Sequence, residues 1–419
     1  MKVILINNNH FITGGADSVY FNTGRILELN GVDVIYYSRN DEKNIYSKYA
    51  SFYPLKIDYG KLSYFKKIKS IKSFIYNKQA KANLIELIDL YKPDVAHLHN
   101  YLGGLTNSVL DALKEKNIPT VMTIHDYRLI CPAYTYFNKK DQICEKCEDK
   151  KYIRCFTNKC SLDGKYSSSL MLSIDAYYRY IISNPMKLID QFIFVSKFSY
   201  YKHVKLHPYI IDKANIIYNT YKSNINSEIK KGNYLLYFGR LSKEKNIVTL
   251  INIVKKLNYR LIIAGKGPLE EKIRNIIQNS LIEYVGYKSG KDLEDLIRNC
   301  SFVVVPSIWY ENNPMTIIEA FSFGKPVIGS KIGGITELLE NERGILYEFN
   351  NENDLFNSIE KAIVISNQEY YKMHENIKKF YNEKISEEIY YKHLIDVYNK
   401  AIANNTNNKR DSKGKIYAR

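Results

Sequence analysis

Two carboxylates, Glu311 and Glu319, stand in E-x7-E spacing in a segment that otherwise contains few charges. Glu319 lies within the apolar stretch 317–321, and burying a carboxylate without a partner costs free energy. We therefore interpret Glu319 as a ligand-binding residue that accepts hydrogen bonds from two neighbouring hydroxyl groups, and Glu311 as an acceptor for sugar hydroxyls. The alternative is a buried ion pair of Glu319 with Arg240 or Lys245.

The residues between these carboxylates predict the start of a helix. Pro314 is favoured at a first helical position, Asn313 is suited to the N-cap, and Gly324 would end the helix. The main-chain N–H groups near Met315 and Thr316 would then have no partner within the helix. Such a helix start is a ready binding site for phosphate oxygens.

Two cations follow the strand predicted at 234–239. Arg240 offers a planar fork of donors and Lys245 a point charge, and two fixed cations can neutralise a departing diphosphate without magnesium. Small residues at the ends of this strand and the next would let a nucleotide approach the backbone. These residues are Gly239, Gly265 and Gly267.

Histidines mark the ends of two further predicted strands. His97 and His99 end the strand at 92–100, and His125 with Asp126 ends the one at 121–127. In open parallel sheets the carboxyl ends of the strands border the ligand crevice. We favour contacts of His97, His99, His125 and Asp126 to substrate hydroxyls. A metal site is the alternative, and no carboxylate lies at ligand spacing to support it.

Four cysteines crowd a polar, lysine-rich insertion over residues 131–165. They are Cys144, Cys147, Cys155 and Cys160. Their density predicts a structural zinc site that stabilises a loop lacking its own core, with Cys131 as a substitute ligand. Four reduced thiols without metal remain the alternative, because the second pair is wider than C-x2-C. Four sulfur ligands would leave no open position, so no catalytic metal is expected. Cys300 is expected in the core.

The length of 419 residues predicts two domains, and the alternation of strands and helices predicts that both are doubly wound α/β units. The first opens with a strand, a Gly14-Gly15 turn and a helix, without the G-x-G-x-x-G spacing of a dinucleotide site. The expected divisions are a first domain, a second domain, a C-terminal helix and a disordered basic tail. They cover 1–222, 223–385, 386–403 and 404–419.

The net charge of +17 predicts attraction to an anionic partner. The segment 61–81 carries seven lysines on a helical apolar pattern, which fits either a surface helix or contact with an anionic membrane surface. The sequence shows neither a signal peptide nor an apolar run of the ~18 residues that a membrane span needs. We expect a cytoplasmic protein, peripheral on the inner face of the cytoplasmic membrane. Nucleic-acid binding is not favoured, because the cysteine spacing lacks the usual pattern.

These segments together resemble the family 4 glycosyltransferases of the GT-B architecture over nearly the whole chain. The matching pieces include the Gly14-Gly15 loop, His125-Asp126, GRLSKEKN and AGKGP, and the most specific is the E-x7-E motif followed by EAFSFGKPVIGSKIGG. The resemblance implies two Rossmann-like domains facing each other across a cleft. It also implies a retaining transferase that uses a nucleotide sugar without a catalytic metal.

By the same resemblance, Arg240 and Lys245 would hold the diphosphate, and Glu319 would bind the ribose. Glu311 would bind the transferred sugar, with His125 beside it and Gly15 close to the phosphates. His97, His99 and Asp126 would lie on the acceptor side. We expect transfer of a hexose from a UDP- or GDP-sugar to a lipid-linked or oligosaccharide acceptor in bacterial capsule or surface polysaccharide synthesis. The alternatives are a catalytically silent partner or scaffold and a sugar-nucleotide epimerase.

Overall fold

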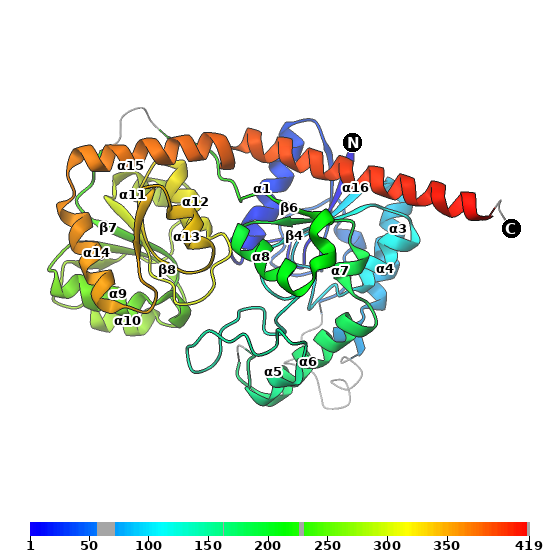
Figure 1. Ribbon diagram of the computed structural model, residues 1–419, viewed down its shortest axis with the longest axis horizontal. Helices are drawn as coiled ribbons and strands as arrows, with labels where there is room; N and C mark the ends of the chain where they lie inside the picture. Colours follow the sequence, from blue (N-terminus) through cyan, green and yellow to red (C-terminus); the bar gives the residue numbers. More distant parts are fainter. Residues whose placement is uncertain (57–71, 162, 226–229, 417–419) are drawn as a thin grey trace.

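The protein consists of two α/β domains that lie side by side, each built on a six-stranded parallel sheet (Figure 1). The computed structural model describes residues 1–56, 72–161, 163–225 and 230–416, with side chains through residue 406. Helices cover both faces of each sheet, which confirms the predicted fold class. The first sheet ends at Ile216 and the second begins at Leu235.

The N-terminal sheet has the strand order β2-β1-β3-β4-β5-β6. Its strands are β1 (Lys2–Ile6), β2 (Asp33–Tyr37), β3 (Val95–Leu98), β4 (Thr120–Ile124), β5 (Gln191–Phe194) and β6 (Ala214–Ile216). The central strands are short apolar runs buried on both faces, as parallel sheets require. The order reverses between β1 and β3, and a crevice opens at such a switch point.

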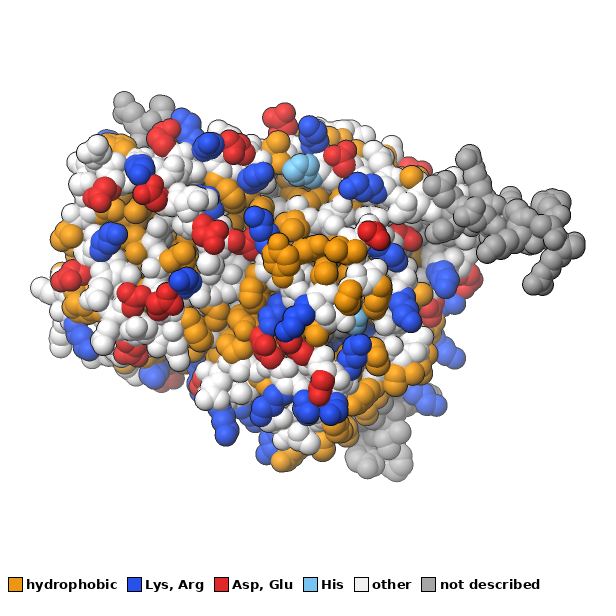
Figure 2. All heavy atoms as spheres, viewed as in Figure 1, with side chains coloured by type: hydrophobic (Ala, Val, Ile, Leu, Met, Phe, Trp, Pro, Cys, Tyr) orange, Lys and Arg blue, Asp and Glu red, His pale blue; other side chains and the backbone are white. Residues whose placement is uncertain are grey.

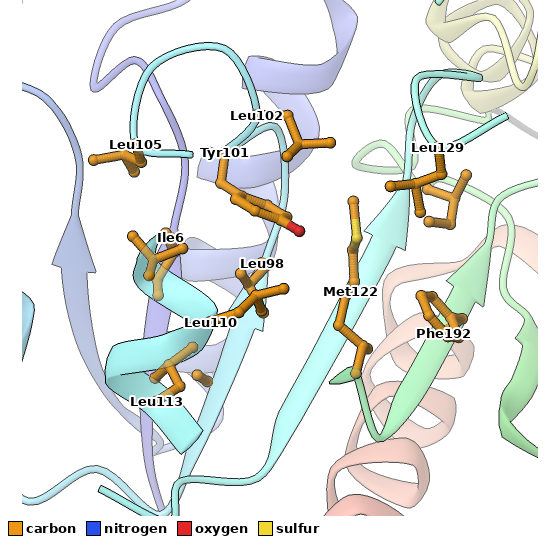
Figure 3. Close-up of a cluster of buried hydrophobic side chains, with 14 of the residues drawn as sticks. Ile6, Leu98, Tyr101, Leu102, Leu105, Leu110, Leu113, Met122, Leu129 and Phe192 are labelled. Carbon is orange, nitrogen blue, oxygen red and sulfur yellow. The ribbon is translucent and has the colours of Figure 1, made fainter. Parts of the chain in front are cut away.

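Helices of the N-terminal domain pack apolar faces on this sheet. They are α1 (Gly15–Leu29), α3 (Lys78–Tyr91), α4 (Ser108–Glu115), α7 (Pro185–Leu188) and α8 (Lys197–Leu206). Figure 3 shows Leu98 and Met122, from neighbouring strands, beside Leu110 and Leu113 of α4. This core lies directly beneath the loops that follow β3 and β4, so it fixes the positions from which those loops start.

The C-terminal sheet has the order β12-β11-β10-β7-β8-β9. Its strands are β7 (Leu235–Arg240), β8 (Leu261–Lys266), β9 (Ile282–Tyr284), β10 (Phe302–Val305), β11 (Val327–Ser330) and β12 (Gly344–Tyr347). Its helices are α9 (Ile247–Lys256), α10 (Glu270–Ile276), α11 (Gly290–Asn299), α12 (Met315–Ser322), α13 (Gly333–Leu339), α14 (Glu352–Val364) and α15 (Asn367–Phe380). Cys300 is fully buried in this domain, as expected.

The last helix, α16 (Glu387–Ile416), leaves the C-terminal domain and runs back along the N-terminal one (Figure 1). Leu394 is fully buried in the core that α1 and the N-terminal sheet share with α16. Tyr390 hydrogen-bonds Thr23 of α1 at 2.7 Å. The predicted disordered tail at 404–419 was therefore wrong for residues 404–416, which continue the helix.

The cysteine-rich insertion contains α5 (Ile153–Thr157), which packs on α6 (Tyr166–Ile181) of the N-terminal domain. Tyr136 and Cys155 are each 1% exposed and belong to the main hydrophobic core of that domain. The expectation of a loop without a core was wrong, because aromatic residues spread through the insertion anchor it to the domain.

Figure 2 shows basic and acidic side chains interspersed over one face of the molecule, with apolar side chains between them. Most of the predicted basic helix at 61–81 lies outside the described residues. In the part of the chain that the structure describes, none of the helices combines the length and apolar character needed to cross a membrane.

The packing of α16 predicts that the N-terminal domain depends on the C-terminus of the chain. Replacing the buried Leu394 by Ala removes apolar contacts and leaves a cavity, so we expect a loss of about 2–5 kcal/mol in the free energy of unfolding. Urea unfolding measures this loss, with Lys392→Ala on the exposed face of the same helix as control. Equal stability of the two variants would show that α16 does not complete this core.

Candidate active site

A cleft of about 1800 Å³ separates the carboxyl ends of the two sheets and is lined by both domains. Pockets for a single small ligand usually measure roughly 300–1,000 Å³, so this cleft has room for two substrates. The glycine turn after β1 and the loops after β3 and β4 form one wall. The loops after β7 and β10, with the start of α12, form the other.

Glu311 occupies the loop between β10 and α12 and is only 6% exposed. Its carboxylate forms an ion pair with Lys245 and accepts a hydrogen bond from the Ser307 hydroxyl at 2.6 Å. Although burial acts in the opposite direction, Lys245 and these hydrogen bonds hold the pKa of Glu311 below its usual value. Glu311 is therefore ionised at neutral pH.

The backbone of Glu311 is held by the glycine turn that starts α13. Gly334 donates its N–H to the Glu311 carbonyl at 2.8 Å. A Cβ at Gly334 would lie 1.7 Å from the Asn312 carbonyl oxygen, a distance no side chain can occupy. Gly333 has φ +56°, a left-handed conformation that favours glycine. The Gly333-Gly334 turn thus shapes the loop that carries Glu311.

The start of α12 differs from the prediction by one residue. Pro314 is the N-cap, and no side chain caps the helix. Asn313 instead accepts two hydrogen bonds from Asn219 of the N-terminal domain. The Asn219 main-chain N–H donates to the Asn313 side-chain oxygen at 3.1 Å, and the Asn219 side-chain amide donates to the Asn313 carbonyl at 3.0 Å. Because Asn313 is engaged elsewhere, the first N–H groups of α12, at Met315 and Thr316, remain open toward the cleft.

Glu319 lies one turn into α12 and faces the cleft. Within the described residues, its carboxylate has neither a hydrogen bond nor an ion pair. Burial raises the pKa of Glu319 to about 8. The alternative of an ion pair with Arg240 or Lys245 is not observed, since Lys245 pairs with Glu311.

Arg240 and Lys245 both line the cleft, at the end of β7 and in the turn that follows. The Lys245 ammonium lies 5.1 Å from the centre of the Trp309 ring, in a cation–π contact. Arg240 is exposed, and the hydrogen bonds and ion pairs of the described residues do not involve its guanidinium. Gly239, Gly265 and Gly267 line the cleft beside these two cations.

The N-terminal wall brings the first glycine turn against α12. Gly14 and Gly15 are exposed, and a Cβ at Gly15 would lie 3.2 Å from Met315 Cγ. The two segments that the sequence assigned to phosphate binding therefore meet across the cleft.

His99 and His125 form a stacked pair on the same wall, with His99 Nδ1 2.8 Å from His125 Nε2. Burial lowers the pKa of His125 to about 3, so its imidazole is neutral at neutral pH. A neutral imidazole can exchange hydrogen bonds with a sugar hydroxyl but carries no charge for a phosphate. Asp126 follows in the cleft lining, and its carboxylate accepts the Arg128 N–H at 2.9 Å.

His97 lies elsewhere. It is fully buried, with Nδ1 2.8 Å from the Tyr398 hydroxyl of α16 and Nε2 2.7 Å from the Thr123 hydroxyl. The expected acceptor contact of His97 was therefore wrong. Side chains alternate along a strand, so His97 and His99 lie on the same face. His97 lies within β3, where α16 covers it, whereas His99 follows the end of the strand and lines the cleft.

Sequence reasoning missed the polar contacts that join the two domains around the Glu311 loop. Asn312 accepts from the Ser196 hydroxyl at 2.6 Å and donates to the Ile124 carbonyl at 2.9 Å. Glu337 of α13 accepts the N–H groups of Lys197 and Phe198 at the start of α8, and α13 lies beside α8 (Figure 1). In the sequence, only the three consecutive polar residues at 311–313 indicated contacts of this kind.

The insertion reaches the same loop. Glu145, between two of the cysteines, accepts a hydrogen bond from the Tyr310 hydroxyl at 2.7 Å and pairs with Lys202 of α8. The Lys202 ammonium lies 5.2 Å from the centre of the Tyr310 ring. A segment predicted only as a metal-binding loop therefore supports the residue next to Glu311.

The four predicted zinc ligands are neighbours in the structure. Cys144 and Cys155 both lie near enough to Cys160 to influence its pKa, and burial raises the pKa of Cys147 to about 12. Across the described residues, however, no group of three or more cysteine, histidine or acidic side chains has the arrangement of a metal site. The structural zinc remains a prediction.

Family models match the two halves of the chain. The model described as "Glycosyltransferase Family 4" matches residues 13–221, and that described as "Glycosyl transferases group 1" matches residues 220–380. The two matches meet at the boundary between the sheets, and together they include every cleft residue named above.

Among similar sequences is an uncharacterized glycosyltransferase of Methanocaldococcus jannaschii, 34% identical over 219 residues. The match covers 51% of this chain and 61% of that protein, so the chain spans less than two thirds of this relative. An uncharacterized 42.6 kDa protein in the cps region of Klebsiella pneumoniae is 23% identical over 356 residues, covering 81% of this chain and 87% of that protein.

Solved structures share the fold over almost the full length. A glycosyltransferase from Rickettsia africae superposes with a TM-score of 0.67 at 16% identity, covering 96% of this chain and 98% of that one. Anabaena HepE, solved in complex with UDP, gives a TM-score of 0.60 at 15% identity, covering 94% of this chain and 99% of that one. At these identities the likeness establishes the fold alone.

The close approach at Gly334 predicts sensitivity to one added methyl group. Because a Cβ at Gly334 overlaps the Asn312 carbonyl, Gly334→Ala must displace the Glu311 loop or the start of α13. We expect a loss of about 1–3 kcal/mol in stability, seen as a lower melting temperature, and Thr336→Ala in the same helix is the control. Unchanged melting of Gly334→Ala would contradict the described packing of this loop.

Proposed function

The chain belongs to the glycosyltransferases of group 1 and family 4 with the GT-B fold, and from this premise we propose that it is a retaining hexosyltransferase. The donor is a UDP- or GDP-sugar, and the acceptor is a lipid-linked saccharide or oligosaccharide. The observation that carries the proposal is the convergence, in one cleft, of the uncapped start of α12, the unpartnered Glu319 and the Lys245–Glu311 pair.

Each part of this arrangement suits one part of a nucleotide sugar. The open N–H groups of α12, together with Arg240 and Lys245, suit the diphosphate, because they place fixed positive charge where the leaving group gains negative charge. The Glu319 carboxylate suits the two hydroxyls of a ribose. The ionised Glu311 suits a hydroxyl of the transferred sugar.

In the reaction, the bond between the anomeric carbon and the diphosphate oxygen breaks, and the carbon passes through an oxocarbenium-like state. The acceptor hydroxyl oxygen bonds to the same face, and its proton passes to an oxygen of the departing diphosphate. His125, neutral because of its burial, can orient a donor sugar hydroxyl. This route uses neither a covalent nucleophile nor a catalytic metal.

A similar protein in the cps region of Klebsiella pneumoniae supports surface polysaccharide assembly as the setting. HepE, which has the same fold and was solved with UDP, supports a UDP-sugar as the donor. The net charge of +17 favours an acceptor anchored at an anionic membrane surface, and it supports a position of the enzyme at the cytoplasmic face of the membrane as part of the proposal.

The proposal predicts that Lys245 and Glu311 are required for turnover. A thermal-shift screen of UDP-, GDP- and dTDP-sugars first identifies the donor, because a bound ligand raises the melting temperature. Release of nucleoside diphosphate from that donor is then measured in Lys245→Ala and Glu311→Gln. We expect losses of roughly 10²–10³-fold, since each variant removes fixed charge or hydrogen bonds from the transition state.

Lys243→Ala is the matched control for these variants. Lys243 belongs to the same turn, and its side chain is 72% exposed and paired only loosely with Asp141 at 3.7 Å. The Lys243→Ala variant should release nucleoside diphosphate at the wild-type rate. Near-wild-type turnover of Lys245→Ala or Glu311→Gln would disprove the roles assigned to them.

The raised pKa of Glu319 predicts pH-dependent nucleotide binding. In the free protein this carboxyl is largely protonated below its pKa of about 8, whereas ribose hydroxyls donate to the ionised form. Binding then releases a proton, so the affinity for UDP should increase several-fold per pH unit between about pH 6 and 8. Calorimetry in buffers of different ionisation enthalpy measures both the affinity and the proton release.

Glu319→Gln isolates this effect from the titration of the nucleotide itself. The variant cannot ionise, so its affinity for UDP should show only the pH dependence of the diphosphate. An identical slope in both proteins would contradict the binding of the ribose by an ionised Glu319.

A further inference from the structure

Helix α6 carries a stripe of apolar side chains on a face that is exposed to solvent. The four members of this stripe follow one another at spacings of four, four and seven residues, and they are Tyr166, Leu170, Ile174 and Ile181. A helix turns once in about 3.6 residues, so these spacings place all four side chains on one side of α6. Single exposed apolar residues are ordinary, but a contiguous stripe about four turns long is typical of an interaction surface.

The other sides of α6 are occupied by the protein itself. Ser169 and Ser173 are buried, and α5 packs on the helix. Leu172 is two residues from both Leu170 and Ile174 in the sequence, which places it on the opposite side of the helix, and it lines the cleft. Figure 1 shows α6 at the edge of the N-terminal domain. The stripe therefore points away from the cleft, with α6 between the two.

Two lysines lie over aromatic rings of the same helix. The Lys159 ammonium is 4.0 Å from the centre of the Tyr166 ring, and the Lys150 ammonium is 5.2 Å from the centre of the Tyr180 ring. Both rings are exposed. A lysine that covers an exposed ring with its apolar stem and keeps its charge at the surface makes that surface apolar and positively charged at once.

The charge around the stripe is positive. From α5 through α7, over residues 153–188, the chain carries five basic and two acidic residues. Arg179 and Asp175 form a buried ion pair, and Arg154 pairs with Asp149 at 3.0 Å. The ion pairs of the described residues do not involve the three other cations, which are Lys159, Lys165 and Lys187. These lysines are therefore available to an anionic partner.

We propose that this surface of α6 docks the protein on an anionic lipid membrane. A bilayer supplies acyl chains and acidic head groups in adjacent layers, which is the combination that the stripe and its lysines match. The leucine and isoleucine side chains enter the boundary of the acyl layer. Tyr166 and Tyr180 lie at the level of the head groups, where tyrosine is enriched in membrane proteins.

Docking on this surface specifies how a lipid-linked acceptor reaches the cleft. The stripe and Leu172 are on opposite sides of one helix, whose diameter with side chains is about 10–12 Å. An acceptor saccharide anchored in the membrane has only to extend past α6 to enter the cleft. This consequence rests on the proposed transferase function, whereas the docking itself does not.

The test measures cosedimentation of the full chain with lipid vesicles. One preparation contains phosphatidylglycerol and phosphatidylcholine in equal amounts, and the other contains phosphatidylcholine alone. We expect tighter binding to the anionic vesicles, and weaker binding to them as salt screens the lysines. Ile174→Gln/Ile181→Gln should bind the anionic vesicles about 10-fold more weakly or worse, because two apolar side chains no longer leave water.

A lysine variant separates charge from apolar contact. Lys159→Gln/Lys165→Gln should bind anionic vesicles about 10-fold more weakly and leave binding to neutral vesicles unchanged. The matched control is Leu29→Gln/Val364→Gln, which removes two exposed apolar side chains at the ends of α1 and α14 and should bind as wild type does. All three variants should keep the wild-type melting temperature and UDP affinity, since the exchanged side chains are outside the donor site.

The docking proposal is wrong if wild type binds neither vesicle, or if either variant on the α6 surface binds anionic vesicles as wild type does. It is equally wrong if the control variant loses binding as fully as they do. Sedimentation velocity tests a second copy of the chain as the occupant: a wild type that dimerises through the stripe, with a monomeric Ile174→Gln/Ile181→Gln variant, would overturn the proposal. Failure to turn over any nucleotide sugar would instead refute the transferase proposal, because vesicle binding is measured without turnover.

Discussion

The burial of the Glu311 carboxylate is the constraint on which the rest of the cleft depends. An ionised carboxylate at 6% exposure is tolerable only with full compensation, and here Lys245 and the Ser307 hydroxyl provide it. Lys245 comes from the loop after β7, whereas Glu311 comes from the loop after β10. The ion pair therefore joins two neighbouring strands of the sheet at their carboxyl ends and fixes the distance between the cation and the carboxylate that the donor must contact.

The same loop also joins the two domains. Asn312 and Asn313 hydrogen-bond to the N-terminal domain on either side, and Tyr310 contacts Glu145 of the insertion. These hydrogen bonds are of the polar kind found between domains that move relative to one another. Tyr310 adds an aromatic contact with Phe198 of α8, with the ring centres 4.9 Å apart. Separation of the domains would break the hydrogen bonds that hold the Glu311 loop, so the geometry of the site and the closure of the cleft change together. Closure that assembles a site in this way also excludes water from it.

The sequence was most informative where a residue type contradicts its surroundings. A carboxylate in the apolar stretch 317–321 and a glycine pair before a helix both require a physical reason, and both lie in the cleft. It was least informative where the outcome depended on which face of an element packs against a distant segment. The sequence predicted the same substrate contact for His97 and His99, and only the structure shows that α16 covers His97. The sequence predicted Asn313 as the N-cap of α12, because no neighbouring residue indicated that Asn219 would donate hydrogen bonds to it.

The two carboxylates of the E-x7-E motif, Glu311 and Glu319, have pKa values shifted in opposite directions. Lys245 lowers the pKa of Glu311, whereas burial without a partner raises that of Glu319 to about 8. Divergent pKa values in one site generally mark divergent roles. A protonated Glu319 adds no negative charge to a cleft that must attract a diphosphate, so it does not oppose donor entry. Once hydroxyl groups reach it, the ionised form becomes the better acceptor, and the energetic cost of its burial is offset by the ligand rather than by the protein. The unpartnered carboxylate thus makes this part of the cleft more stable when occupied than when empty.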